Sequence, residues 1–113
     1  MARLPPRLTK RSEFLRAAAR GRKAARPGLV LQALPQPGAR LRVGFTATKK
    51  IGGAVVRNRC KRRLRAAIRQ AVAEAPMPGY DLVAIARDAT RTRPWQQLLG
   101  DLRGALRQAG VLP

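Results

Sequence analysis

The sequence has no histidine, one cysteine and only five acidic residues. Without histidine the chain has no His general base, no Ser-His-Asp triad and no His-ligated metal. The acids are scattered, and no two stand three or four residues apart, the helical spacing that would hold a pair of metal ions. The single Cys60 cannot form an internal disulfide, so we expect a protein of the reducing cytoplasm. The composition predicts no catalytic residue, no metal bound by the protein alone and no organic cofactor.

Aromatic residues and long apolar runs are also scarce. Aromatics make up 4% of the chain, and no apolar run approaches the roughly 18 residues that span a bilayer. The N-terminus has no apolar stretch typical of a secretory signal, and we expect no membrane partner. A hydrophobic content of 45% is nevertheless too high for a disordered basic tail. We therefore predict a single domain over residues 1–113, with a loosely ordered N-terminal segment 1–8.

Positive charge is what the chain has in excess. Its 25 Lys and Arg against five acids give a formal net charge of +20. Residues 1–69 hold 20 basic residues and one acid, whereas residues 70–113 hold five basic and four acidic residues. Arginine outnumbers lysine 20 to 5, which favours phosphate recognition, although a genome rich in G and C would also raise this ratio. The charge asymmetry predicts a surface for a polyanion, most simply a nucleic acid.

Apolar periodicity and turn residues predict six elements in the order α-β-β-α-β-α. Ser12 is expected to cap a short first helix that runs from Glu13 to Ala19 and ends at Gly21, followed by a basic loop over 22–28. Strands are predicted over 29–34, 41–48 and 80–86, and helices over 54–75 and from Thr92 to a C-cap at Gly110. The strand-helix-strand unit 41–86 implies two neighbouring parallel strands in an otherwise antiparallel sheet. The fold class is therefore α+β, with helices packed on a small mixed sheet.

The predicted helix 54–75 has an apolar stripe and a polar face that is almost purely cationic. Seven cations and no acid lie between Arg57 and Arg69. Like charges three or four residues apart on a helix repel each other, and the phosphates of a nucleic acid would relieve this repulsion on binding. A merely solvated face is the commoner explanation of a charge run, but the missing acids weaken it. A membrane-surface helix would need more Trp, Phe and Leu on its apolar side.

Four segments together resemble the protein subunit of bacterial ribonuclease P. Arg-Asn-Arg at 57–59 is followed by Cys-Lys-Arg-Arg-Leu-Arg, and Arg-Val-Gly-Phe-Thr-Ala-Thr-Lys-Lys-Ile-Gly precedes it at 42–52. Leu-Thr-Lys-Arg-Ser-Glu-Phe at 8–14 and Tyr-Asp at 80–81 match in the same order, so the resemblance covers about residues 7–107. It implies a ribosomal-protein-S5-domain-2-like fold with an additional edge strand and a left-handed βαβ crossover.

The resemblance also implies a function. Proteins of this family assemble with a large catalytic RNA that removes the 5′ leader of precursor tRNA with Mg²⁺, so the RNA carries the chemistry. We expect a monomer bound 1:1 to that RNA. By position, the residues expected to bind the catalytic RNA are Arg57, Asn58, Arg59, Lys61, Arg62 and Arg65, to which the helical face adds Arg69. The residues expected to bind the precursor leader are Arg7, Lys10, Phe14, Gln32, Thr46, Thr48, Lys49 and Lys50.

Several positions depart from the family or leave alternatives open. Ala18 and Gln32 stand where relatives often have aromatic residues, which predicts weaker base stacking in the leader cleft. Gly53 replaces a frequent Asn. Phe14 could equally be a plain core residue, and Cys60 is expected to pack in the core rather than serve a redox or metal site. The alternatives to this function are a basic structural protein of the ribosome and, less favoured because no dimer is suggested, a DNA-compacting protein.

Overall fold

The computed structural model describes residues 3–113, which form three α-helices, four strands and one short 3-10 helix. The six predicted elements all occur, and the strand β1 and the 3-10 helix η1 are additional. In chain order the elements are α1 (Arg11–Arg20), β1 (Arg22–Arg26), β2 (Leu29–Pro35), β3 (Arg42–Thr46), α2 (Ala54–Glu74), β4 (Tyr80–Ala86), η1 (Asp88–Arg91) and α3 (Trp95–Gln108).

The strands form one mixed sheet in the order β1-β2-β4-β3. β2 pairs antiparallel with both β1 and β4, whereas β3 pairs parallel with β4. The predicted parallel pair, separated by a helix in the sequence, is thereby confirmed. The connection from β3 through α2 to β4 is the crossover for which the resemblance implies a left hand.

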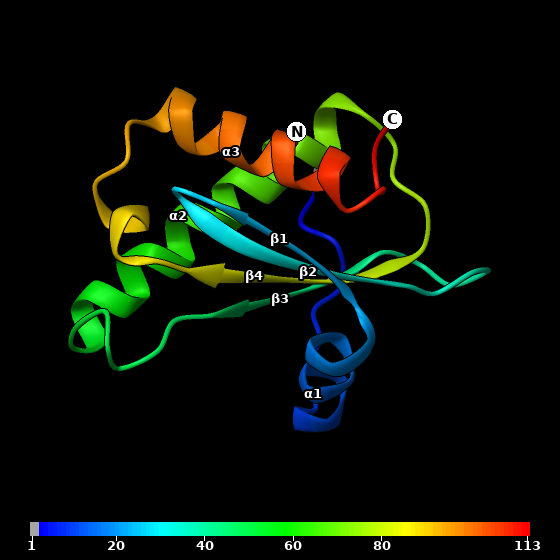
Figure 1. Ribbon diagram of the computed structural model, residues 1–113, viewed down its shortest axis with the longest axis horizontal. Helices are drawn as coiled ribbons and strands as arrows, with labels where there is room; N and C mark the ends of the chain where they lie inside the picture. The colour runs from blue at the N-terminus through cyan, green and yellow to red at the C-terminus, as the bar shows by residue number, and fades with distance from the viewer. Residues whose placement is uncertain (1–2) are drawn as a thin grey trace.

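Helices cover both faces of this sheet, as Figure 1 shows: α2 and α3 lie over one face and α1 lies against the other. The main core lies under α2 and α3 and includes the inward side chains of every strand. A smaller cluster under α1 consists of Leu8, Ala17 and Val83, with Phe14 and Ile85 packed against it. β4 contributes to both cores, which explains why its sequence is a continuous apolar run rather than an alternating one.

The predicted basic loop over 22–28 is wrong, because most of it is the edge strand β1. Residues Arg22–Arg26 pair with Leu29–Ala33 of β2. This strand has no β-branched or aromatic residue, and Ala24 is its only fully buried residue. Its sequence therefore shows neither strand propensity nor apolar alternation. The backbone hydrogen bonds to β2 stabilise this segment as a strand although its own residues do not favour one. β1 is the additional edge strand that the resemblance implied.

The predicted cap at Ser12 is also wrong, because α1 starts two residues earlier with Lys10 as N-cap. The Glu13 carboxylate accepts hydrogen bonds from the backbone N–H groups of Thr9 (3.1 Å) and Lys10 (2.9 Å). These two bonds satisfy donors that a helix start otherwise leaves free. A carboxylate that reaches back along the chain therefore sets the start of α1.

Further boundaries shift slightly, and α3 begins at Trp95 rather than at Thr92, which instead is the C-cap of η1. β3 ends at Thr46 rather than at 48, since the chain turns there and the Ile51 N–H donates to the Thr48 carbonyl (3.1 Å). The C-cap of α3 is Ala109, and the predicted Gly110 follows it with a positive φ of 83° that favours glycine. The predicted bounds of β2, α2 and β4 hold to within one residue.

The predicted loose segment 1–8 falls partly outside the described residues, which exclude positions 1–2. Its last residues run beside β3: the Val43 N–H donates to the Pro6 carbonyl (3.0 Å), and the Leu8 N–H donates to the Val43 carbonyl (2.8 Å). Leu8 is buried in the smaller core. Residues 6–8 are therefore attached to the sheet edge.

Candidate nucleic-acid interface

Helix α2 is seated on the sheet by the apolar stripe that its sequence predicts. Cys60, Leu64, Ala67, Ile68 and Ala71 are each at most 2% exposed and belong to the main core. Burial raises the pKa of the Cys60 thiol, which keeps it protonated. The predicted packing role of Cys60 is thus confirmed. Because this stripe packs against the core, the opposite side of α2 faces solvent.

The seven residues predicted to bind the catalytic RNA lie on that solvent side and on one flank of α2. Asn58, Arg59, Arg62 and Arg69 are exposed, whereas Arg57, Lys61 and Arg65 are half-buried. The three half-buried residues recur every four positions and so form a row along one flank. The ion pairs within residues 3–113 involve none of the seven. Their charge is left for a partner.

Arg63 is the exception in this stretch. Its guanidinium donates hydrogen bonds to the backbone carbonyls of Thr90 (2.5 Å) and Arg93, on the flank opposite the Arg57 row. The side chain holds α2 against η1 and the start of α3. Arg63 therefore belongs to the scaffold, while its neighbours face outward.

Four of the five acids are engaged by arginines other than the residues of this face. Arg42 bridges Glu13 of α1 (2.5 Å) and the fully buried Asp81 of β4 (2.9 Å). The backbone N–H groups of Lys10 and Thr9, together with Arg42, lower the pKa of Glu13 to about 2. Asp101 pairs with Arg93, and Glu74, near the end of α2, pairs with Arg103. These pairs leave the charge of the α2 face uncompensated.

The predicted leader cleft lies on the α1 side of the sheet. Across β2, β4 and β3 the register aligns Gln32, Val83 and Gly44 in one row, and Val30, Ile85 and Thr46 in the next. The Phe14 ring lies directly on Gly44: a Cβ there would come within 2.5 Å of its Cε1. Only glycine permits this close approach. Phe14 thus covers the first row and leaves the second half-exposed beside it.

The structure brings some predicted leader residues together and separates others. Thr46 ends the open row, and the exposed Thr48, Lys49 and Lys50 follow in the turn that leads into α2. Lys10 is exposed at the start of α1. Arg7 lies instead over the Phe45 ring, 5.4 Å from its centroid, on the face opposite Phe14.

Gln32 contributes little surface to the cleft, because it is only 7% exposed. Conversely, Val30 and Ile85 are half-buried next to Thr46 and extend the open row. Both strands are apolar runs in the sequence, so neither the face that Val30 and Ile85 occupy nor the register that aligns them with Thr46 was visible there. The half-exposed surface beside Phe14 is therefore apolar, and the hydroxyls of Thr46 and Thr48 and the two lysines follow at one end.

Residues 3–113 offer neither a metal-binding cluster nor a membrane-spanning helix. No group of three or more Cys, Asp or Glu side chains gathers there in a way that could hold a metal ion. No helix in the same range is both long and apolar enough to cross a membrane.

Fold and site together define a small α+β protein with one strongly cationic helix face, suited to a polyanionic partner. Residues 4–110 match the family model described as Ribonuclease P. The "Ribonuclease P protein component" of Gluconacetobacter diazotrophicus is 57% identical, with 98% of this chain and 97% of that one covered. The component of Paramagnetospirillum magneticum is 49% identical, with 99% and 88% covered. The chain belongs to the ribonuclease P protein family.

Solved structures agree with this assignment. The RNase P protein of Staphylococcus aureus superposes with a TM-score of 0.78 at 27% identity, covering 95% of this chain and 97% of that one. The protein from Thermotoga maritima gives 0.76 at 25% identity, covering 90% and 96%. This chain is thus a protein component of an endoribonuclease ribonucleoprotein that works with an RNA subunit in tRNA processing. Family membership decides against the ribosomal and DNA-compacting alternatives.

Proposed function

We propose that this protein is the non-catalytic subunit of ribonuclease P, which binds the catalytic RNA through α2 and the 5′ leader of precursor tRNA in the cleft beside α1. The observation that carries the proposal is the cationic face of α2, whose side chains lack acidic partners within residues 3–113. Phosphates of the catalytic RNA supply the missing negative charge and release their counterions on binding.

The leader lies across the half-exposed row that ends at Thr46. Apolar side chains and the Phe14 edge contact its bases, while Lys49 and Lys50 contact its phosphates. Because Lys50 stands four residues before Ala54, this end of the cleft adjoins the start of α2. One protein monomer thereby touches both RNAs, screens their mutual repulsion and keeps the leader in place.

The RNA carries the chemistry in this proposal. Mg²⁺ ions bound by the catalytic RNA would supply the chemistry, and the cationic residues of this chain would raise their occupancy indirectly by screening charge. The complex contains one protein per RNA and acts in the cytoplasm.

A reconstitution assay tests the proposal. Purified protein, a bacterial ribonuclease P RNA and a precursor tRNA with a labelled leader are combined at low Mg²⁺. We expect no cleavage by the protein alone, weak cleavage by the RNA alone and strong cleavage by both. Efficient cleavage by the RNA-free protein, or no gain on adding the protein to the RNA, would overturn the proposal.

A further inference from the structure

A groove lies at the amino end of β3, opposite the end where Thr46 and Thr48 stand. It consists of two adjoining hollows of about 580 and 460 Å³, one toward the end of α2 and one toward α1. Both hollows are lined by Pro6, Ala39 and Arg40. We call this feature the Arg40 groove. None of its lining residues is among those predicted to bind the catalytic RNA or the leader.

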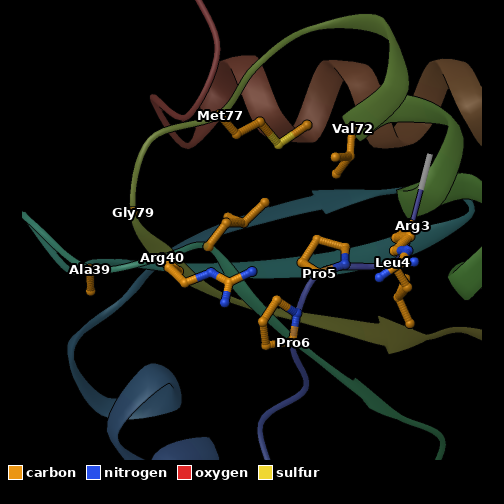
Figure 2. Close-up of a pocket in the computed structure, with 10 residues that line it drawn as sticks. Arg3, Leu4, Pro5, Pro6, Ala39, Arg40, Val72, Met77 and Gly79 are labelled. Atoms are coloured by element: carbon orange, nitrogen blue, oxygen red, sulfur yellow. The ribbon is translucent and has the colours of Figure 1, made fainter.

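The larger hollow has an apolar lining. Figure 2 shows the side chains of Met77 and Val72 on one side of it, and Pro5, Pro6 and Arg40 on the other. Leu4 and Leu41 complete the apolar surface. The residues of 3–113 that line the hollow include no aromatic ring, but apolar side chains of this kind can also pack against the faces of a nucleobase.

Positive charge borders the groove. Arg3 lines the larger hollow, Arg16 of α1 lines the smaller one, and Arg40 lines both. These three arginines take no part in the ion pairs of residues 3–113. The nearby carboxylates, Glu13 and Asp81, are already held by Arg42, which itself lines the smaller hollow. The groove therefore favours an anion over any other ligand.

The groove also continues the cationic flank of α2. Val72, which lines the larger hollow, stands seven residues after Arg65, two helical turns further along the same flank. At 1.5 Å per residue this separation is about 10 Å, the reach of one or two nucleotides. An RNA that follows the row Arg57, Lys61 and Arg65 arrives directly at the hollow.

We propose that the Arg40 groove binds an unpaired nucleotide of the catalytic RNA. Its base enters the hollow between Met77, Val72 and the Pro5-Pro6 segment, and its flanking phosphates contact Arg40 and Arg3. The inference rests on the proposed function, since it assigns the groove to the RNA already placed on α2. It adds a second contact region that neither the α2 face nor the leader cleft contains.

The first test compares Arg40→Ala with Arg22→Ala. Arg22 is an exposed arginine on β1, at the far edge of the sheet, so both variants lose the same charge. We expect Arg40→Ala to weaken binding of the catalytic RNA about five- to tenfold at moderate salt and to lower the slope of log K against log salt by about one. Equal affinities for the two variants would overturn the inference. So would a loss confined to precursor tRNA binding by the holoenzyme.

The second test places a photoactivatable cross-linker in the groove through Ala39→Cys. Ala39 is exposed on the rim, and the native Cys60 is fully buried, so only the new thiol reacts. Gly100→Cys on the outer face of α3 is the matched control, because nothing lies within 4 Å of a Cβ there. We expect cross-links from position 39, but not 100, to one unpaired region of the catalytic RNA in the holoenzyme.

The two proposals fail in different ways. If Ala39→Cys gives no RNA cross-link while the same preparation stimulates cleavage at low Mg²⁺, the groove is not an RNA site and the proposed function stands. If the protein neither binds nor stimulates the catalytic RNA, the proposed function fails and the inference fails with it.

Discussion

Arginine has opposite surroundings in two regions of this molecule. In the scaffold, Arg42, Arg93 and Arg103 each hold a carboxylate that joins distant elements, such as α1 to β4 or α2 to α3. On the outer face of α2, Arg59, Arg62 and Arg69 take no part in the ion pairs of residues 3–113. The contrast shows that four of the five acids act locally, in ion pairs of the scaffold. They stabilise the scaffold locally and leave one face electropositive, so the two sets of arginines should respond differently to mutation.

The largest effect is expected from Asp81→Ala in the scaffold. Asp81 is 1% exposed and accepts hydrogen bonds from Arg42 and Gln36. Its removal leaves Arg42 with Glu13 alone and leaves the Gln36 amide without its acceptor, which should lower the free energy of unfolding by about 3 kcal/mol in urea titrations. The exposed Asp88 is the matched control, and Asp88→Ala should stay within about 0.5 kcal/mol of the parent. Equal losses in both variants would contradict the contrast.

The double variant Arg59→Ala, Arg62→Ala should weaken RNA binding without lowering the stability of the protein. Because like charges on α2 repel, stability should be unchanged or slightly higher. Binding to the catalytic RNA should weaken, and the slope of log K against log salt should fall by about two, one per lost phosphate contact. Binding measured over a range of salt, together with urea unfolding, checks both halves. A destabilised protein with an unchanged salt slope would assign these arginines to the scaffold.

Phe14→Leu sharpens the boundary between scaffold and interface. Leucine still covers Gly44 but offers no ring on which a base can stack. Stacking of one base on an aromatic side chain contributes about 1–3 kcal/mol to the binding free energy. We expect about fivefold weaker holoenzyme binding to precursor tRNA, with binding of mature tRNA unchanged. If both substrates are affected equally, Phe14 serves only as a core residue.

The smallest effect concerns pH. Folding lowers the pKa of Glu13 from 4.5 to about 2, so its stabilising contribution is complete above pH 4.5 and disappears as the pH falls through 2. The Tm difference between the parent and Glu13→Gln should be constant above about pH 5 and shrink between pH 4.5 and 2. A difference that does not depend on pH would mean that the Glu13 charge is irrelevant to folding.

The sequence was sufficient for the elements that bury a clear apolar pattern. The stripe of α2 and the apolar run of β4 predicted their bounds closely, because burial on one or both sides constrains nearly every residue in them. β1 escaped prediction since Arg22, Lys23 and Arg26 surround a single buried alanine, and only pairing with β2 makes that segment a strand.

The candidate site divides in the same way. The cationic face of α2 followed from helical periodicity alone, whereas the leader cleft depends on register and on which face each strand residue occupies. Side chains alternate between the two faces of a sheet, so Leu8 faces Phe14 while Arg7, one residue earlier, lies over Phe45 on the other face. No local sequence pattern revealed which of the two faces Arg7 would occupy. The Arg40 groove was likewise invisible, because it joins residues from four separate stretches of the chain.

The two bonds from Arg63 to the carbonyls of Thr90 and Arg93 have a consequence for binding entropy. Together with the Glu74–Arg103 pair, they tie α2 to its neighbours at its middle and at its C-terminal end, which opposes rotation of the helix about its axis. Its outward charges are therefore presented at a fixed angle before any RNA arrives. Association then costs the ordering of side chains alone, and not of the backbone that carries them.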